Sequence, residues 1–197
     1  MAAQPVLHVL AGPNGAGKTT LATRVILPAT GLVFINADEI VLRDGLNATD
    51  QAYEASARAA AERDVLLASR TSFVTETVFS HPSKVQLLQT AKDNGYRIVL
   101  HVVLVPADLS VARVNDRVRH GGHAVAEEKI RQRHARLWAH VAEAITIADE
   151  VHVYDNSRAA TPLRLLARFE RGSVVGTPTW PVWAPGELTA IIANRGT

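Results

Sequence analysis

Residues 6–20 read VLHVLAGPNGAGKTT, and this stretch decides the fold of the chain. It satisfies the pattern G-x-x-x-x-G-K-[ST], a phosphate-binding loop (P-loop), with its fixed positions at Gly12, Gly17, Lys18 and Thr19. The apolar residues Val6–Leu10 predict a buried strand before the loop, and Lys18–Ile26 predict a helix after it. A strand, a glycine-rich turn and a helix in this order are the context that the motif requires.

The composition of this loop indicates what it would bind. Its glycines let the backbone turn tightly, so that successive N–H groups face an anion at a helix N-terminus. Lys18 would reach the β- and γ-phosphates, and the Thr19 hydroxyl would ligate the Mg²⁺ that bridges them. We therefore expect ATP or GTP with Mg²⁺, bound by Gly12, Pro13, Asn14, Gly15, Ala16, Gly17, Lys18, Thr19 and Thr20. The alternative is a glycine-rich turn that fits the pattern by chance.

Length and composition narrow the class of protein. A chain of 197 residues is enough for one α/β domain, so residues 1–197 are expected to form a single one. The formal net charge is only +2 and no long Lys/Arg block occurs, which gives no support for a nucleic-acid partner. Cysteine is absent, which excludes disulfides and thiolate metal sites. No uncharged apolar stretch is long enough for a membrane span, so a cytoplasmic location is expected.

Strand and helix patterns alternate after the loop. This predicts an α/β, three-layer fold with a mostly parallel sheet and helices on both faces. The run RIVLHVVLV at Arg97–Val105 is the most β-rich and predicts the central strand. Further strands are expected at 31–36, 72–75 and 151–154, an edge hairpin at 163–168 and 173–175, and helices at 48–69, 82–94, 107–119, 126–148 and 187–194. Residues 158–197 are expected to be C-terminal edge elements.

Other motifs separate the classes of P-loop protein. No N-K-x-D occurs, as a GTPase would need, and no L-S-G-G-Q, as a transport ATPase would need. The strand RIVLHVVLV is followed by Pro106-Ala107-Asp108 rather than closed by an acidic residue, which weakens the case for a mechanical ATPase. A small-molecule kinase needs a base near the acceptor hydroxyl, a substrate clamp and arginines that close over the transferred group.

Two carboxylates follow predicted strands at the edge where α/β folds place their ligands. Asp38 in INADEI could accept the proton of an acceptor hydroxyl, or it could simply cap the following helix. Glu76 in SFVTETVFS could bind the substrate, or it could be an exposed loop carboxylate. Their neighbours Glu39 and Thr77 are assigned to the substrate with them.

An arginine-rich segment at 107–136 has the features of a lid. Arginines lie on both sides of Gly121-Gly122, which would act as a hinge. These arginines are Arg113, Arg117, Arg119, Arg131, Arg133 and Arg136. Arg113 and Arg117 are four residues apart and share a helix face, so they could reach one polyphosphate. The alternative is a surface hairpin with salt bridges to Asp116, Glu127 and Glu128. His123 is taken as a lid residue, and the histidines lack zinc spacing.

Taken together, these motifs resemble the zeta toxin family of P-loop kinases. The matching stretches are AGPNGAGKTT, FINADEI, TETVFS, RVNDRVRHGGHAVAEEKIRQRHARLW and YDNS, in the family's order from residue 11 to residue 157. The chain departs from the pattern at Ala126, where short members usually have Pro, and it lacks the long C-terminal extension of larger toxins.

The resemblance implies a kinase that phosphorylates the 3′-hydroxyl of the amino sugar in UDP-N-acetylglucosamine, using ATP or GTP and magnesium. It also implies a cognate antitoxin protein that holds the kinase inactive. Carried over, Asp38 is the base, Glu76 a substrate-binding carboxylate, and Arg117 with Arg133 the catalytic lid arginines beside Lys18. His123 could take the place of the second cation, and Asn156 in YDNS either lines the nucleobase or is an ordinary turn residue.

A rival hypothesis stays open at this point. The chain could be a nucleotide-binding regulatory ATPase or switch with a protein partner, or a kinase of another small hydroxyl compound such as an antibiotic. Carboxylates at the ends of two strands favour a kinase, since a switch has no need of them.

Overall fold

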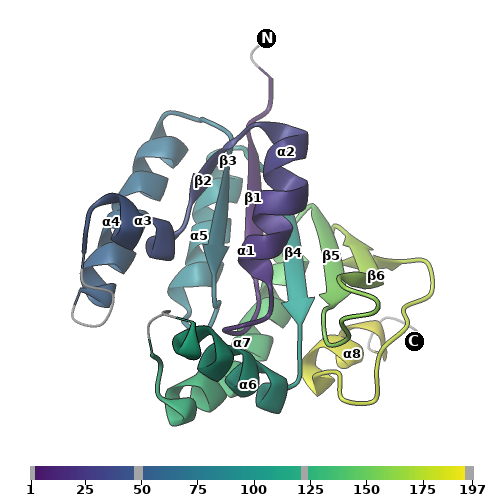
Figure 1. Cartoon of the computed structure of the whole chain (residues 1–197). Helices are drawn as coiled ribbons and strands as arrows, with labels where there is room; N and C mark the ends of the chain where they lie inside the picture. The colour runs from purple at the N-terminus through teal and green to yellow at the C-terminus, as the bar shows by residue number, and fades with distance from the viewer. Residues whose placement is uncertain (1–2, 47–50, 121–123, 194–197) are drawn as a thin grey trace.

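The computed structural model describes residues 3–46, 51–120 and 124–193. Within them the strands form one seven-stranded sheet in the order β2-β3-β1-β4-β5-β6-β7 (Figure 1). The first five strands of this order run parallel to one another, and the last two are antiparallel additions. In that order the strands are β2 (Val33–Ile35), β3 (Phe73–Thr77), β1 (Val6–Ala11), β4 (Arg97–Leu104), β5 (Glu150–Asp155), β6 (Arg164–Glu170) and β7 (Ser173–Val175).

The predicted central strand is confirmed. β4 lies fourth of the seven strands, and every residue of it after Arg97 is buried. A strand with both faces covered must be apolar on both faces, which is why RIVLHVVLV reads as a continuous run rather than as an alternation. The antiparallel pair β6–β7 matches the hairpin expected at the edge.

Helices cover both faces of the sheet, which confirms the three-layer α/β fold of P-loop kinases. One continuous helical stretch, α1 (Lys18–Leu21), η1 (Ala22–Ile26) and α2 (Leu27–Thr30), lies in front of the sheet in Figure 1. Leu21, Ala22 and Ile26 bury its apolar side against Leu10 and Val103. It runs four residues past its predicted end and stops at Gly31, which adopts φ 66°.

The opposite face carries three longer helices. They are α4 (Ala52–Ala68), α5 (Ser83–Asp93) and α7 (Glu127–Ile147), which pack apolar residues into one core with β1 and β4. Two more helices are α6 (Ala107–Arg119), which lies beside the P-loop, and α8 (Gly186–Ala193), the last element of the described chain. No helix among the residues that the structure describes is long and apolar enough to cross a membrane.

A short helix, α3 (Ala37–Arg43), follows β2 directly. Its N-cap is Asn36, whose side chain accepts a hydrogen bond from the Asp38 backbone N–H at 2.9 Å. The alternative that Asp38 caps this helix is therefore wrong. Since Asn36 satisfies the helix end, the Asp38 carboxylate is left exposed and available for chemistry.

Candidate active site

The P-loop lies at the carboxyl end of β1. Gly12, Gly15 and Gly17 all have positive φ, at 149°, 69° and 96°, so the loop follows a path that other residues rarely adopt. A Cβ atom on Gly12 would lie 2.4 Å from the Val103 carbonyl oxygen, and one on Gly17 would lie 2.4 Å from Asn156 Nδ2. Glycine at these two positions is thus required by close packing as well as by the turn.

Lys18 points into the loop and is nearly inaccessible, with 5% of its surface exposed. Its Nζ donates to the Pro13 carbonyl at 3.0 Å and lies 3.6 Å from Oε1 of Glu76. Burial lowers the pKa of the Lys18 ammonium, and the negative charge of Glu76 opposes that shift. A desolvated cation with one counter-charge is suited to receive the more highly charged phosphates of a nucleotide.

Glu76 contacts three other residues of the site: Lys18, Thr19 and Asn36. It lies on β3 in register with Leu10 of β1, and its Oε2 accepts hydrogen bonds from Thr19 Oγ1 at 2.7 Å and Asn36 Nδ2 at 3.1 Å. Only 12% of its side chain is exposed, so the alternative of an exposed loop carboxylate is wrong. Glu76 therefore joins the ends of three elements: β2, β3 and the first turn of α1.

The contact between Thr19 and Glu76 also indicates where Mg²⁺ could bind. A hydroxyl and a carboxylate are the hard oxygen donors that Mg²⁺ prefers, and Thr19 Oγ1 and Glu76 Oε2 lie side by side at the mouth of the P-loop. The donor chemistry of these two side chains therefore fits the ion. The sequence had assigned Glu76 to the substrate alone, and only the pairing of β1 with β3 reveals this second position.

Asp38, the predicted base, and Arg117, a predicted lid arginine, lie within ion-pair distance of each other. Asp38, in the first turn of α3, places Oδ2 at 3.9 Å from Nη1 of Arg117, near the C-terminal end of α6. Both side chains are about half exposed, at 57% and 42%. An ion pair this open is weak and easily replaced by substrate groups. The structure thus brings Lys18, Thr19, Glu76, Asp38 and Arg117 to one edge of the sheet.

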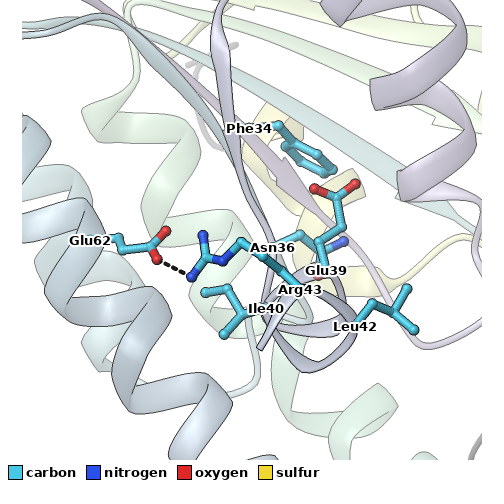
Figure 2. Close-up of a pocket in the computed structure, with 7 residues that line it drawn as sticks. All are labelled: Phe34, Asn36, Glu39, Ile40, Leu42, Arg43 and Glu62. Carbon is cyan, nitrogen blue, oxygen red and sulfur yellow. Dashed lines mark hydrogen bonds and ion pairs between the residues drawn. The ribbon is translucent and has the colours of Figure 1, made fainter. Parts of the chain in front are cut away.

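A pocket of about 430 Å³ opens beside this cluster (Figure 2). Its residues come from β2, α3 and α4 and mix apolar with charged groups: Phe34, Asn36, Glu39, Ile40, Leu42, Arg43 and Glu62. Figure 2 shows the Glu39 carboxylate near the ring of Phe34, and the Arg43–Glu62 ion pair that links α3 to α4. Burial, with the nearby charge of Glu76, raises the pKa of Glu39. Glu39 thus lines this pocket together with Asn36, which donates a hydrogen bond to Glu76.

α6 is attached to the P-loop by side-chain hydrogen bonds that the sequence did not predict. Ser110, which is fully buried, donates to the Asn14 carbonyl at 2.6 Å. Arg113 donates to the carbonyls of Gly15 at 3.3 Å and Asn156 at 2.9 Å, so its guanidinium is already used by the protein. The first part of the predicted lid, around Ser110 and Arg113, is therefore attached to the P-loop.

Asn156 takes a position that neither alternative foresaw. Its Nδ2 donates to the Ala16 carbonyl at 2.8 Å, and its Oδ1 accepts from the Leu163 N–H at 3.2 Å. It is thus no ordinary turn residue, because it ties the end of β5 to the P-loop. Contact with the nucleobase stays a prediction.

The remaining predicted residues lie apart from this cluster. Arg131 pairs with Glu127 and with Asp108 of α6, so it has the structural role that the hairpin alternative gave it. Arg133 is half-buried and makes no hydrogen bond or ion pair within the described ranges, and burial together with Arg136 lowers its pKa. Thr77 Oγ1 accepts from the Phe79 N–H at 3.3 Å. His123 and the hinge at Gly121-Gly122 lie outside the described residues.

Solved structures with the same fold include a toxin–antitoxin system and a kinase. The AvrRxo1-ORF1:AvrRxo1-ORF2 complex with sulphate ions matches with a TM-score of 0.66 and 18% identity, over 92% of this chain and 66% of that one. The PezAT toxin–antitoxin system of Streptococcus pneumoniae matches with a TM-score of 0.59 and 16% identity, over 100% and 81%. Shikimate kinase from Acinetobacter baumannii in complex with shikimate matches with a TM-score of 0.50 and 20% identity, over 79% and 86%.

The sequence itself matches the model of one family. The match to the zeta toxin model spans residues 1–162, which include the P-loop, Asp38, Glu76, Arg117 and Asn156. The resemblance inferred from short motifs is therefore confirmed over most of the chain, and this protein belongs to the zeta toxin family.

Proposed function

We propose that this chain is an ATP- or GTP-dependent phosphotransferase that moves the γ-phosphoryl group to a hydroxyl, the 3′-hydroxyl of a UDP-N-acetyl sugar. It would act in the cytoplasm as a toxin of the zeta type. Membership of the zeta toxin family supports the reaction class. One observation carries the proposal: a carboxylate, a buried lysine and an arginine from three different elements converge around Glu76 at the mouth of the P-loop.

The donor side of the reaction follows from the P-loop. Its backbone N–H groups would bind the phosphates, and Lys18 would exchange its contact with Glu76 for the β- and γ-phosphates. Thr19, with Glu76 beside it, would hold Mg²⁺. The ion supplies charge neutralisation on the phosphates when it is bound.

The acceptor side follows from Asp38. Its exposed carboxylate stands at the start of α3, next to the pocket that Glu39 lines, and would accept the proton of the acceptor hydroxyl as the hydroxyl attacks. Arg117 lies close to Asp38 before substrate binds, and on binding it would turn to the transferred phosphoryl group and stabilise the charge there. Glu76, between the two sides, would orient the sugar through Oε1, the oxygen that Lys18 would release on binding the phosphates.

A protein partner is part of the proposal. Two structural neighbours contain a second protein: AvrRxo1-ORF1 is in complex with AvrRxo1-ORF2, and PezAT is a toxin–antitoxin system. By analogy, a cognate antitoxin would bind this chain and block its nucleotide site. Co-purification of the chain with the product of an adjacent reading frame would test this part.

The substrate is tested by direct phosphoryl transfer. The chain is incubated with ATP or GTP, Mg²⁺ and a panel of UDP-sugars, and the products are analysed by mass spectrometry. We expect a gain of one phosphoryl group on UDP-N-acetylglucosamine, and no gain with the Asp38→Asn variant. Transfer only to hydroxyl compounds that lack a nucleotide would overturn the sugar assignment and keep the kinase. Nucleotide hydrolysis without transfer to any acceptor would favour a regulatory ATPase.

A further inference from the structure

One buried residue close to Glu76 adopts a backbone conformation that its side chain disfavours. Phe79 has a φ of 68°, in the left-handed region, where the Cβ of a bulky residue crowds its own backbone. Among the residues that the structure describes, three other non-glycine residues have positive φ, and all three are at least partly exposed: Arg70, Leu163 and Arg171. Phe79 is fully buried, so packing holds its strained conformation in place.

The side chain of Phe79 anchors this conformation. It belongs to the core cluster that also contains Ile35 of β2, Ile40 of α3 and Val85 of α5. A ring in a close-packed core cannot shift without moving its neighbours. The turn that follows β3 is therefore fixed from inside the core.

The backbone of Phe79 is joined to the end of β3. Its N–H donates to Thr77 Oγ1 at 3.3 Å, and Thr77 is the last residue of the strand, paired in register with Ala11 of β1. Glu76 directly precedes Thr77 in the same strand. A change in the backbone at Phe79 would thus be passed through the end of the strand to the Glu76 carboxylate.

Glu76 would depend on this anchor most when a nucleotide is bound. In the free protein its carboxylate is held by hydrogen bonds from Asn36 and Thr19 and by the charge of Lys18. Under the proposed function Lys18 turns to the phosphates and Thr19 to Mg²⁺, and of these three contacts the one from Asn36 remains. The backbone of β3 must then keep the carboxylate in place for the acceptor.

We propose that Phe79 is a positioning residue for phosphoryl transfer: its buried ring holds the turn after β3 in a strained conformation, and this turn keeps Glu76 directed at the acceptor. The inference rests on the proposed function, in which Glu76 orients the acceptor. It gives a role to a core side chain that would not itself touch the substrate. Strained backbone conformations cluster at sites whose geometry must be fixed in advance.

The proposal is tested by the kinetics of two variants and one control. Phe79→Gly accepts a φ of 68° without strain but has no ring to anchor it, and Phe79→Leu keeps an apolar side chain. The control is Phe73→Leu, which shortens a fully buried phenylalanine three residues before Glu76, as Phe79 lies three residues after it. We expect Phe79→Gly to lower kcat/KM for the acceptor about 100-fold and Phe79→Leu about tenfold, with the KM for ATP unchanged.

The control separates positioning from stability. Phe79→Leu and Phe73→Leu should lower the melting temperature by similar amounts, because each leaves space in the core. Phe73→Leu should nevertheless keep wild-type acceptor kinetics. Wild-type acceptor kinetics in a folded Phe79→Leu protein, or an equal loss in Phe73→Leu, would make Phe79 an ordinary core residue. Phe79→Leu decides the test where Phe79→Gly does not fold.

Amide hydrogen exchange distinguishes failure of this inference from failure of the proposed function. It is measured with a saturating non-hydrolysable ATP analogue and Mg²⁺, and it needs no acceptor. We expect faster exchange at Glu76 and Thr77 in the Phe79 variants than in the wild type, and no change there in Phe73→Leu. If no UDP-sugar is phosphorylated but exchange changes in this way, the positioning of Glu76 stands and the sugar assignment fails. If UDP-N-acetylglucosamine is phosphorylated and the Phe79 variants match the wild type in both measurements, the positioning role fails and the function stands.

Discussion

Arg117 of α6 lies 3.9 Å from Asp38 of α3, although 79 residues separate them in the sequence and no strand pairing joins their elements. The contact lies at the edge of the sheet that also carries the P-loop. On the other side of the loop, Ser110 and Arg113 fix the first half of the same helix. The first half of α6 is therefore attached to the P-loop, while its C-terminal end carries Arg117, the predicted lid arginine that lies near the predicted base.

Lys18→Ala should abolish phosphoryl transfer and leave the fold intact. Lys18 is a buried cation whose partners are a backbone carbonyl and Glu76, and Glu76 keeps its hydrogen bonds to Thr19 and Asn36 in the variant. Activity is measured by transfer of labelled phosphate and folding by far-UV circular dichroism. Full transfer by a folded variant would show that the P-loop is not the phosphate site.

Asp38→Asn should lower the turnover number about 100-fold or more while ATP affinity stays unchanged, in line with typical general-base contributions. The amide keeps the size of the side chain but cannot accept a proton. Thermal stability should not change, because Asn36 is the N-cap.

Asn36→Ala is the matched comparison for that variant. It should cost about 1 kcal/mol of unfolding free energy, since the cap of α3 is lost, and it also removes a hydrogen bond to Glu76. If Asp38→Asn lost stability instead of turnover, Asp38 would be a structural residue.

Arg117→Ala should lower turnover far more than it weakens ATP binding, because its contact with the phosphoryl group tightens in the transition state. Amide hydrogen exchange with and without a non-hydrolysable ATP analogue would locate the motion. Protection should increase at the end of α6 near Arg117 and change little around Ser110, which is already bonded to the loop. Equal protection throughout α6, with normal turnover in the variant, would remove the lid assignment.

Asn156→Ala should raise the KM for ATP and for GTP by the same factor, about tenfold, because a lost side-chain bond to the loop affects any triphosphate. Both polar atoms of the side chain are bonded to the chain itself, at Ala16 and Leu163. The KM values for ATP and GTP are measured by steady-state kinetics for the wild type and the variant. A change in the ratio of the two KM values would instead show contact with the nucleobase.

Acid should destabilise this protein through histidines that the sheet buries. Burial, with His8 and His152 nearby, lowers the pKa of His101 from 6.5 to about 3. Below pH 6.5 His101 binds a proton in the unfolded chain but stays neutral in the folded chain. Stability that is present at neutral pH is therefore lost as the pH falls toward 3. The loss from this residue should reach about 2–3 kcal/mol at pH 4.5. His101→Gln should flatten the dependence of melting temperature on pH, and an unchanged acid slope would contradict the assignment.

Residue spacing was sufficient to predict the parts of the fold that depend on neighbours along the chain. The P-loop, the apolar run of β4 and the helix at 107–119 follow from residue spacing, because a turn, a strand or a helix is set by contacts over a few residues. The position of Asp38 and Glu76 at strand ends followed from the same patterns. The zeta toxin resemblance added roles, since its motifs occur in a fixed order.

Tertiary structure alone decided which of these groups touch. The parallel pairing of β1 with β3 places Glu76 against Thr19, 57 residues apart, and Asn156 reaches Ala16 across 140 residues. Arg113 and Arg117 look equivalent in the sequence, yet one holds the loop and the other faces Asp38. Strand order and helix packing set such contacts, and no local spacing encodes them.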